Sequence, residues 1–218
     1  MKIQALRNIG LFESLSDAEL DSLAPHFVTR KFPKNAVIMT EGDDTNSLYV
    51  VLKGRVKVFL NDENGKEVIL NDQGVSEYFG EVSLFDDGKR SASVMTLEPC
   101  EFAVLEKQAF IACLAANPQL ALTIIRGLTL RLRALSDNVR NLALMDVYGR
   151  VAHTLLEMAE DHDGQKVITE RLTQTELAAR VGASSKMVSR IMKELTVGGF
   201  IRKDGKQIVI SKALPASW

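Results

Sequence analysis

The stretch from residue 174 to residue 193, QTELAARVGASSKMVSRIMK, constrains the fold more than any other part of this sequence. It places a small residue, a glycine and two apolar residues at offsets of 0, 4, 10 and 13, namely Ala178, Gly182, Val188 and Ile191. A small residue lets two helices pack closely, and a glycine supplies the positive φ that the turn between them needs. An ordinary helical hairpin with a glycine corner would share part of this pattern, but the full spacing predicts a helix-turn-helix.

The two helices of this motif have predictable starts. Thr173 followed by Glu176 predicts a capping box, so the first helix should begin near Gln174. The second should begin near Ser184, and recognition helices contact base edges with residues near their N-terminus. The candidate DNA-binding residues of the two helices are Thr173, Gln174, Ser184, Ser185, Lys186, Ser189, Arg190 and Lys193.

Three of these residues have predicted roles. Arg190 is the candidate for a bidentate contact to guanine, Lys186 for a base or phosphate contact, and Lys193 for a phosphate contact. The following FIRKDGKQIVI predicts a β-hairpin wing around Asp204-Gly205. The basic residues expected along the DNA backbone at its tip are Arg202, Lys203 and Lys206.

The charge distribution supports this interpretation. Residues 171–206 hold eight Lys or Arg and three acidic residues, a net charge of +5 in a chain whose total is −1, so the remainder carries −6. A basic segment on an acidic body is typical of a polyanion-binding module. Charge alone would fit a solvated face equally well, so the prediction depends on the motif.

Composition excludes several other classes. The chain is 46% hydrophobic and 25% charged, has no apolar run near the roughly 20 residues of a membrane span, and starts without a signal-peptide core. A cytoplasmic protein without a membrane partner is expected. Cys100 and Cys113 predict neither a disulfide framework nor a metal site. The sequence has no zincin, nucleophile-elbow, P-loop or dinucleotide-binding motif, so no enzyme is expected.

The N-terminal half changes from helical to β-type patterning. The first 30 or so residues are predicted to be helical, with a capping box at Ser16 and Glu19. Glycines then separate short β-rich runs, which predicts an all-β roll, sandwich or barrel; the runs are Ala36–Met39, Leu48–Leu52, Val56–Leu60, Glu67–Leu70, Ala92–Met95 and Phe102–Leu105. Asn64-Gly65 between two runs predicts a type I′ hairpin turn.

A long helical pattern follows from Lys107 to Leu144, with a break expected near Asn117-Pro118. Apolar residues recur in it at spacings of 3, 4, 3, 4 and 3, at Ile125, Leu128, Leu132, Leu135, Val139 and Leu142. This narrow stripe predicts a coiled-coil homodimer, and the alternative is a helix packed on its own β-domain, which usually has a wider apolar face.

Several ordered motifs resemble the cyclic-AMP receptor protein/FNR (Crp/Fnr) family of bacterial transcription regulators, over essentially the whole length. They are G-D-x(4)-L-Y-x-V-L-K-G at 42–54, N-G-K-E-V-I-L at 64–70, F-G-E-V-S-L-F at 79–85, R-S-A at 90–92 and N-L-A-L-M-D-V-Y-G-R-V-A at 141–152, followed by the helix-turn-helix.

The resemblance implies an α+β fold. Its expected parts are a cyclic-nucleotide-binding β-roll of jelly-roll type within residues 1–116, a coiled-coil dimerisation helix and hinge over 117–145, and a winged helix-turn-helix over 146–218. It also implies a homodimer on a pseudo-palindromic site in double-stranded DNA, and a contact with RNA polymerase. The expected mechanism is a population shift, passed on through a hinge near Leu144-Met145-Asp146.

The family's phosphate-binding cassette matches Gly80-Glu81 and Arg90-Ser91-Ala92. Arg90 offers a fork of donors to a cyclic phosphate, and Glu81 can accept from a ribose hydroxyl. The alternative is that Arg90 pairs with Asp86 or Asp87 on a surface hairpin. The effector-site residues that the resemblance implies are Gly80, Glu81, Val82, Arg90, Ser91, Ala92, Val58, Leu70, Asn71 and Tyr78, with Leu135 and Ser136 of the dimer helix.

Two departures from the family pattern bear on specificity. Cyclic-AMP-responsive members have a Thr-Ser pair where this chain has Leu135-Ser136, and leucine cannot hydrogen-bond a base edge. Three possibilities follow: another effector such as cyclic di-GMP, a dimer already active without ligand, or cyclic AMP bound without the threonine. Ser185-Lys186 replaces the Arg-Glu that reads TGTGA-like half-sites, so an altered half-site is expected.

The chain also lacks what other branches of the family need. No cysteine precedes Cys100, which argues against the four-cysteine iron–sulfur site of the FNR branch. His26, His153 and His162 match no haem-sensing position. The expected cofactor is therefore a cyclic nucleotide, cyclic AMP first, with no metal, haem or cluster.

Overall fold

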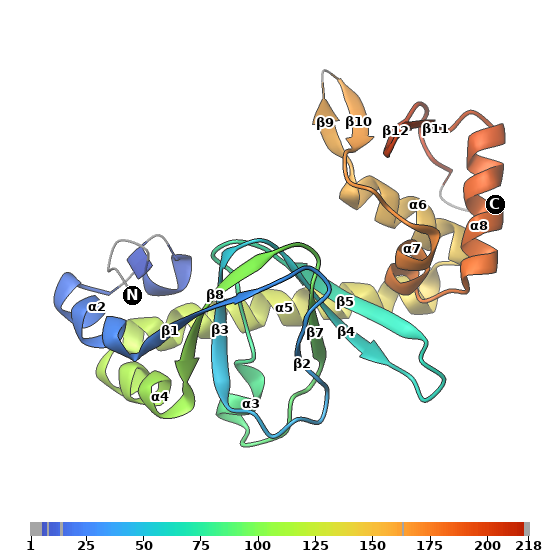
Figure 1. Ribbon diagram of the computed structural model, residues 1–218. Helices are drawn as coiled ribbons and strands as arrows, with labels where there is room; N and C mark the ends of the chain where they lie inside the picture. Colours follow the sequence, from blue (N-terminus) through green and yellow to red (C-terminus); the bar gives the residue numbers. More distant parts are fainter. Residues whose placement is uncertain (1–5, 8, 14, 163, 216–218) are drawn as a thin grey trace. The chain divides into compact units, whose positions relative to one another are not determined.

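The structure is a computed structural model that describes residues 6–7, 9–13, 15–162 and 164–215 (Figure 1). It divides into two compact units, which are described separately. The first takes the chain up to Leu60 together with Ile69–Leu132, and the second takes Asn61–Val68 and the chain from Arg133 on. The division falls inside the predicted dimerisation segment, and the predicted boundaries at 116/117 and 145/146 stay predictions.

The N-terminal part holds η1 (Gly10–Phe12), α2 (Asp17–Leu23) and η2 (Ala24–His26). The predicted capping box is formed in full, since the side chains of Ser16 and Glu19 each accept from the other's backbone amide. The helical prediction is wrong from Phe27 on, where strand β1 (Phe27–Phe32) begins. Pro25 cannot continue the hydrogen bonding of α2, and the next residues pair with strand β8 instead.

Two four-stranded sheets form the β-roll of the first unit. One has the order β1-β8-β3-β6 and the other β2-β7-β4-β5. The bounds are β2 (Val37–Met39), β3 (Ser47–Lys53), β4 (Val56–Asn61), β5 (Glu67–Gln73), β6 (Tyr78–Phe79), β7 (Ser93–Thr96) and β8 (Cys100–Glu106), with the short helix α3 (Val82–Phe85) after β6. All six predicted runs overlap a strand, whereas β1 and β6 were not predicted.

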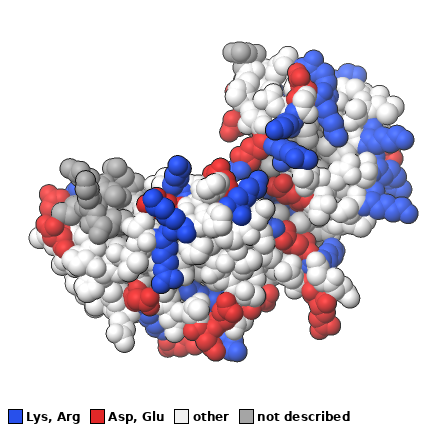
Figure 2. Space-filling model, viewed as in Figure 1, with Lys and Arg blue, Asp and Glu red and all other residues white. Residues whose placement is uncertain are grey.

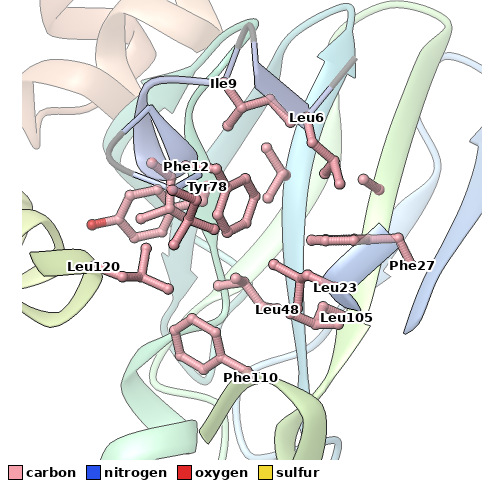
Figure 3. Close-up of a cluster of buried hydrophobic side chains, with 14 of the residues drawn as sticks. Leu6, Ile9, Phe12, Leu23, Phe27, Leu48, Tyr78, Leu105, Phe110 and Leu120 are labelled. Atoms are coloured by element: carbon pink, nitrogen blue, oxygen red, sulfur yellow. The ribbon is translucent and has the colours of Figure 1, made fainter. Parts of the chain in front are cut away.

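Strand β3 is buried on both faces. Tyr49 and Val51 belong to an inner cluster with residues of both sheets, such as Phe102 of β8 and Val94 of β7. Leu48 belongs to an outer cluster that joins the first sheet to the helices around it, shown in Figure 3. This explains why β3 is a nearly continuous apolar run rather than an alternating one.

The turn between β4 and β5 differs from the predicted type I′ turn. Gly65 has a φ of +76°, but Asn64 is not among the residues with positive φ. The Asp62 carboxylate accepts from the amides of Asn64 (2.9 Å) and Lys66 (2.8 Å), so only the glycine has to adopt the left-handed region. The hairpin itself is confirmed, because β4 and β5 are neighbours in their sheet.

The predicted helix break is confirmed between α4 (Lys107–Ala116) and α5 (Pro118–Leu144). The Asn117 side chain stabilises it: Oδ1 accepts from the Leu120 amide (3.1 Å), and Nδ2 donates to Glu19 (2.7 Å). Among the described residues, no single helix is long and apolar enough to cross a membrane. The pair α4 and α5 passes the same length and composition test only together, across a bend of 113°.

The second unit contains α6 (Val147–Met158), β9 (Glu160–His162), β10 (Gln165–Ile168), α7 (Gln174–Val181), α8 (Ser185–Val197), β11 (Ile201–Asp204) and β12 (Gln207–Ile210). Its four strands form one sheet in the order β11-β12-β10-β9, of which only the last hairpin, β11–β12, was predicted. Its core joins the three helices to this sheet through residues such as Leu155, Leu177, Val188, Leu195 and Ile208.

Candidate functional site

The guanidinium of Arg90 lies inside the first unit, and the residue is only 3% exposed. Its Nε donates to Thr45 Oγ1 (2.9 Å), and its Nη1 donates to the Gly80 carbonyl (2.6 Å) and to Ser83 Oγ (3.0 Å). Its Nη2 donates to the Ser47 carbonyl (2.8 Å). All four acceptors are uncharged.

This geometry excludes the alternative that Arg90 pairs with a surface aspartate. The Asp87 carboxylate forms an ion pair with Lys107, whose hydrogen bond and charge hold the pKa of Asp87 below its usual value. Asp86 accepts from the Gly88 amide at 2.9 Å. Both carboxylates therefore have partners other than Arg90.

Arg90 is consequently a buried cation that has no counter-ion among the residues the structure describes. None of the ion pairs formed among residues 6–7, 9–13, 15–162 and 164–215 involves it. Burial lowers the pKa of Arg90, and electrostatic interactions with Tyr49, Glu81 and Asp43 act against that shift. A buried charge that has only neutral partners is unfavourable, and an anion placed beside it would relieve the cost.

Gly80 is required by the packing of Arg90. Its φ is +84°, and a Cβ there would lie 2.7 Å from Arg90 Nη1 and 2.9 Å from the Ser47 carbonyl oxygen. The sequence predicts that Gly80 allows the backbone to approach an anion closely. The structure adds that no side chain fits between β6 and the arginine.

Glu81 is also buried, at 3% exposure, rather than facing water. Its carboxylate accepts from Arg131 Nη1 of α5 at 2.5 Å, and Arg131 Nη2 donates to the Tyr78 carbonyl at the same distance. The Arg131 guanidinium also lies over the Tyr78 ring, 4.5 Å from its centroid. Sequence reasoning missed Arg131, because it searched α5 only for the apolar stripe.

The other predicted effector-site residues are dispersed. Val58 packs against the inner cluster, whereas Tyr78 belongs to the outer cluster (Figure 3), where a Cβ on Gly127 of α5 would lie 2.4 Å from its hydroxyl. Ala92 is buried and Leu70 is half-buried, while Asn71, Val82 and Ser91 are exposed. Leu135 and Ser136 belong to the second unit. Among the described residues, no group of three or more His, Cys, Asp or Glu is arranged to hold a metal ion.

The helix-turn-helix has the predicted starts. Thr173 caps α7 by accepting from the Glu176 amide (3.1 Å), and Ser184 caps α8 by accepting from the Met187 amide (3.3 Å). The predicted capping box at Thr173 is only half formed, because the Glu176 carboxylate accepts from Arg180 at 3.0 Å instead of turning back to the cap.

Gly182 forms the turn with a φ of +65°, and a Cβ there would lie 3.2 Å from Leu142 Cδ2. Arg150 of α6 also connects the end of α7 to the residues that follow α5. Its Nε donates to the Val181 carbonyl (2.8 Å) and its Nη1 to the Met145 carbonyl (2.9 Å). The C-terminal end of α5 is thus held against the helix-turn-helix within one unit, on both sides of the predicted hinge.

We expect Gly182→Ala to destabilise the second unit by roughly 1–3 kcal/mol, because it adds a left-handed alanine and crowds Leu142. Gly205→Ala is the matched control, since Gly205 has a φ of +59° with nothing within 4 Å of the added Cβ. Thermal unfolding followed by circular dichroism measures both. Equal losses of stability would show that the contact with Leu142 contributes nothing.

The polar face of α8 and the wing are open to solvent. Ser184, Ser185, Lys186, Arg190 and Lys193 are exposed and Ser189 is half-buried. Figure 2 shows Lys and Arg gathered over α8 and the β11–β12 hairpin. The exposed basic residues of that hairpin are Arg202, Lys203 and Lys206, and at the start of α7 Thr173 and Gln174 are also exposed.

The predicted apolar stripe of α5 divides into two parts. Leu128 packs against the outer cluster of its own unit. The others are exposed: Ile125 57%, Leu132 64%, Leu135 45%, Val139 63% and Leu142 51%. These side chains form an exposed apolar row on α5.

Residues 29–117 match the cyclic nucleotide-binding domain, and residues 149–213 match the Crp-like helix-turn-helix domain. The chain is 37% identical over 201 residues to the cAMP-activated global transcriptional regulator CRP of Haemophilus influenzae, covering 89% of this chain and 88% of that protein. The chain belongs to the Crp/Fnr family of transcription regulators. It is therefore a regulator that binds DNA through its helix-turn-helix, and not an enzyme, as the sequence predicts.

Two further proteins are similar to the chain over most of their length. The CRP-like cAMP-activated global transcriptional regulator of Mycobacterium tuberculosis is 31% identical over 212 residues, 95% of each chain. The solved structure of the c-di-GMP responsive global regulator CLP of Xanthomonas campestris aligns with a TM-score of 0.80 at 26% identity, covering 90% of this chain and 100% of that one. The predicted α+β fold, with a β-rich N-terminal domain, a long helix and a helix-turn-helix with a small sheet, is confirmed.

Proposed function

We propose that this Crp/Fnr regulator binds cyclic AMP beside Arg90 and, as a homodimer, binds a pseudo-palindromic operator in the cytoplasm. One observation carries the effector assignment: Arg90 is 3% exposed and all its acceptors are neutral. A cyclic phosphodiester supplies the single negative charge that such a cation lacks. The proposal needs no metal, haem or iron–sulfur cluster.

The chemistry of the neighbouring groups suits the rest of a cyclic nucleotide. Glu81 can accept from a ribose hydroxyl, and Ser91 offers an exposed hydroxyl next to Arg90 in the sequence. The two relatives from H. influenzae and M. tuberculosis are named as cAMP-activated, which favours cyclic AMP. The relative from X. campestris is named as c-di-GMP responsive, so cyclic di-GMP is the second candidate.

The dimer assignment is supported by the exposed stripe of α5. Burial of such a row in a coiled coil removes apolar surface from water, and two-fold symmetry then presents two recognition helices to half-sites about 34 Å apart. The effector would shift the population of dimers toward the DNA-binding arrangement. We also propose a contact with RNA polymerase, which membership of a family of transcription regulators supports.

The test is calorimetric titration of the purified chain with cyclic AMP, cyclic GMP and cyclic di-GMP, followed by mobility shift on promoter DNA with and without each nucleotide. We expect cyclic AMP to bind and to increase DNA binding. If only cyclic di-GMP bound, the effector would be cyclic di-GMP and not cyclic AMP. If no nucleotide bound, the assignment of a nucleotide effector would be wrong, and DNA binding would still be measured by the mobility shift.

Leu135 allows a separate prediction. It belongs to the apolar stripe of α5, is 45% exposed, and stands where the family pattern of cyclic-AMP-responsive members has a threonine. It should therefore stabilise the dimer without ligand. We expect Leu135→Thr to weaken the ligand-free dimer and to raise the ratio of DNA binding with cyclic AMP to DNA binding without it by about 10-fold. Mobility shift and sedimentation measure the two effects.

The matched control is Leu132→Thr, one seam position earlier and 64% exposed. It should weaken the dimer to a similar extent without raising the ratio, because no hydroxyl is expected to contact the effector there. Equal ratios in the two variants would mean that Leu135 has no special part in the response.

A further inference from the structure

Arg90 has little left to offer an effector as a hydrogen-bond donor. A guanidinium has five N–H groups, and four of them donate to Thr45, Ser47, Gly80 and Ser83. Only one N–H, on Nη2, has no acceptor among the described residues. Arg90 therefore provides its charge and at most one hydrogen bond, unless the protein gives up one of its own.

A phosphodiester has two non-bridging oxygens, each able to accept more than one hydrogen bond, so other donors have to complete the site. The hydroxyls in contact with Arg90 are those of Ser83 and Thr45. Ser83 is 1% exposed, whereas Thr45 is exposed. Of the two, Thr45 is the one that a ligand entering from solvent can reach.

The hydroxyl of Thr45 also has a proton available to donate. A threonine hydroxyl accepts two hydrogen bonds and donates one. Its oxygen accepts from Arg90 Nε at 2.9 Å, and within the described part of the chain its proton has no acceptor. Because the oxygen already faces a cation, the proton is more acidic in character and suits an anionic acceptor.

The position of Thr45 is fixed relative to Arg90 by the main chain as well. The Gly42 amide donates to the Arg90 carbonyl (2.9 Å), and the Arg90 amide donates to the Asp43 carbonyl (3.0 Å). The Asp43 carboxylate accepts from the Thr40 amide (2.8 Å), which stabilises the turn between β2 and β3. This loop therefore forms one wall of the arginine site.

We propose that Thr45 contacts the effector directly, its oxygen accepting from Arg90 Nε while its proton is donated to one non-bridging phosphate oxygen. The proposal rests on the proposed function and adds a binding residue from the β2–β3 loop, far from the cassette in sequence.

The test compares Thr45→Val, which keeps the shape and removes the hydroxyl, with Thr45→Ser, which keeps the hydroxyl. Calorimetry with cyclic AMP should show binding weakened by roughly 10- to 100-fold in the valine variant and by less than about threefold in the serine variant. Thr40→Val is the control, because Thr40 is an exposed threonine of the same loop and is not one of the four residues that accept hydrogen bonds from the Arg90 guanidinium. Thermal unfolding without ligand checks that all three variants fold.

A second measurement separates a direct contact from an effect through Arg90. The Rp and Sp phosphorothioates of cyclic AMP each replace one non-bridging oxygen by sulfur, a weaker acceptor. A direct contact means that Thr45→Val changes the ratio of the two affinities. An equal loss for both would make Thr45 a positioning residue, and wild-type affinity in Thr45→Val would also overturn the proposal. If the wild-type chain bound no nucleotide, the proposed function would fail first.

Discussion

Replacement of Arg190 by alanine is expected to weaken binding to the natural operator by roughly 30-fold to 10⁴-fold. A bidentate contact from arginine to guanine contributes about 1–3 kcal/mol of discrimination, and a symmetric dimer makes it twice. Each 1.4 kcal/mol is a factor of ten in affinity, so two lost contacts give this range. The loss should be small on DNA of unrelated sequence.

The environment of Arg190 is compatible with this role. Its side chain is 66% exposed on α8, with Nε 3.8 Å from a Glu194 oxygen one turn later and Nη2 3.1 Å from Met187 Sδ. These are weak surface contacts that a base edge can replace at little cost. The Ser184 cap fixes the start of α8, so Arg190 lies in its second turn, within reach of a major groove.

Lys203→Ala in the wing is the matched control for Arg190→Ala. A lysine that contacts only phosphate contributes equally to all sequences, so its loss should lower operator and non-operator affinity by the same factor and reduce the salt dependence of binding. Fluorescence anisotropy on operator and scrambled duplexes at several salt concentrations measures both variants. If Arg190→Ala lowered both affinities equally, Arg190 would be a phosphate contact and the guanine assignment would be wrong.

The parts of the fold that the sequence predicted are those determined by residues close together in the chain. The helix-turn-helix depends on a glycine, two caps and an apolar spacing within a few turns, and the structure has all of them between Thr173 and Leu195. The break at Asn117-Pro118 is equally local. Strand β6 has only two residues, too few for any periodicity, and β1 follows a helix whose apolar pattern continues into it.

The surroundings of Arg90 were predicted only in part, because its hydrogen-bond partners are distant in sequence. The pattern predicted Gly80, Glu81 and Arg90, but not that Thr45 and Ser47 accept from the arginine. Thr45 is in the β2–β3 loop, which follows β2, and Arg90 precedes β7, the strand that pairs with β2. Ser47 begins β3, which belongs to the other sheet. Arg131 was missed for a similar reason, since its partner Glu81 lies 50 positions away.

Replacement of Arg90 by methionine is expected to reduce the affinity for cyclic AMP by at least about 100-fold, because the buried positive charge and the one hydrogen bond that Arg90 can still donate to the phosphate are lost together. The stability of the ligand-free chain should change little. The substitution removes an unfavourable buried charge, which stabilises the fold, and it leaves the Gly80 and Ser47 carbonyls without this donor, which destabilises it.

Calorimetry and thermal unfolding on the same preparation measure the two effects, with Lys89→Met as the control. Lys89 is the exposed cation next to Arg90 in sequence, so its loss should change neither quantity appreciably. If Arg90 served only to stabilise the β-roll, Arg90→Met would lower the stability of the chain and its affinity for cyclic AMP together. Loss of cyclic AMP binding with a retained fold is the result expected of an anion site. In such a site the buried charge of Arg90 stabilises the bound anion and does not stabilise the ligand-free fold.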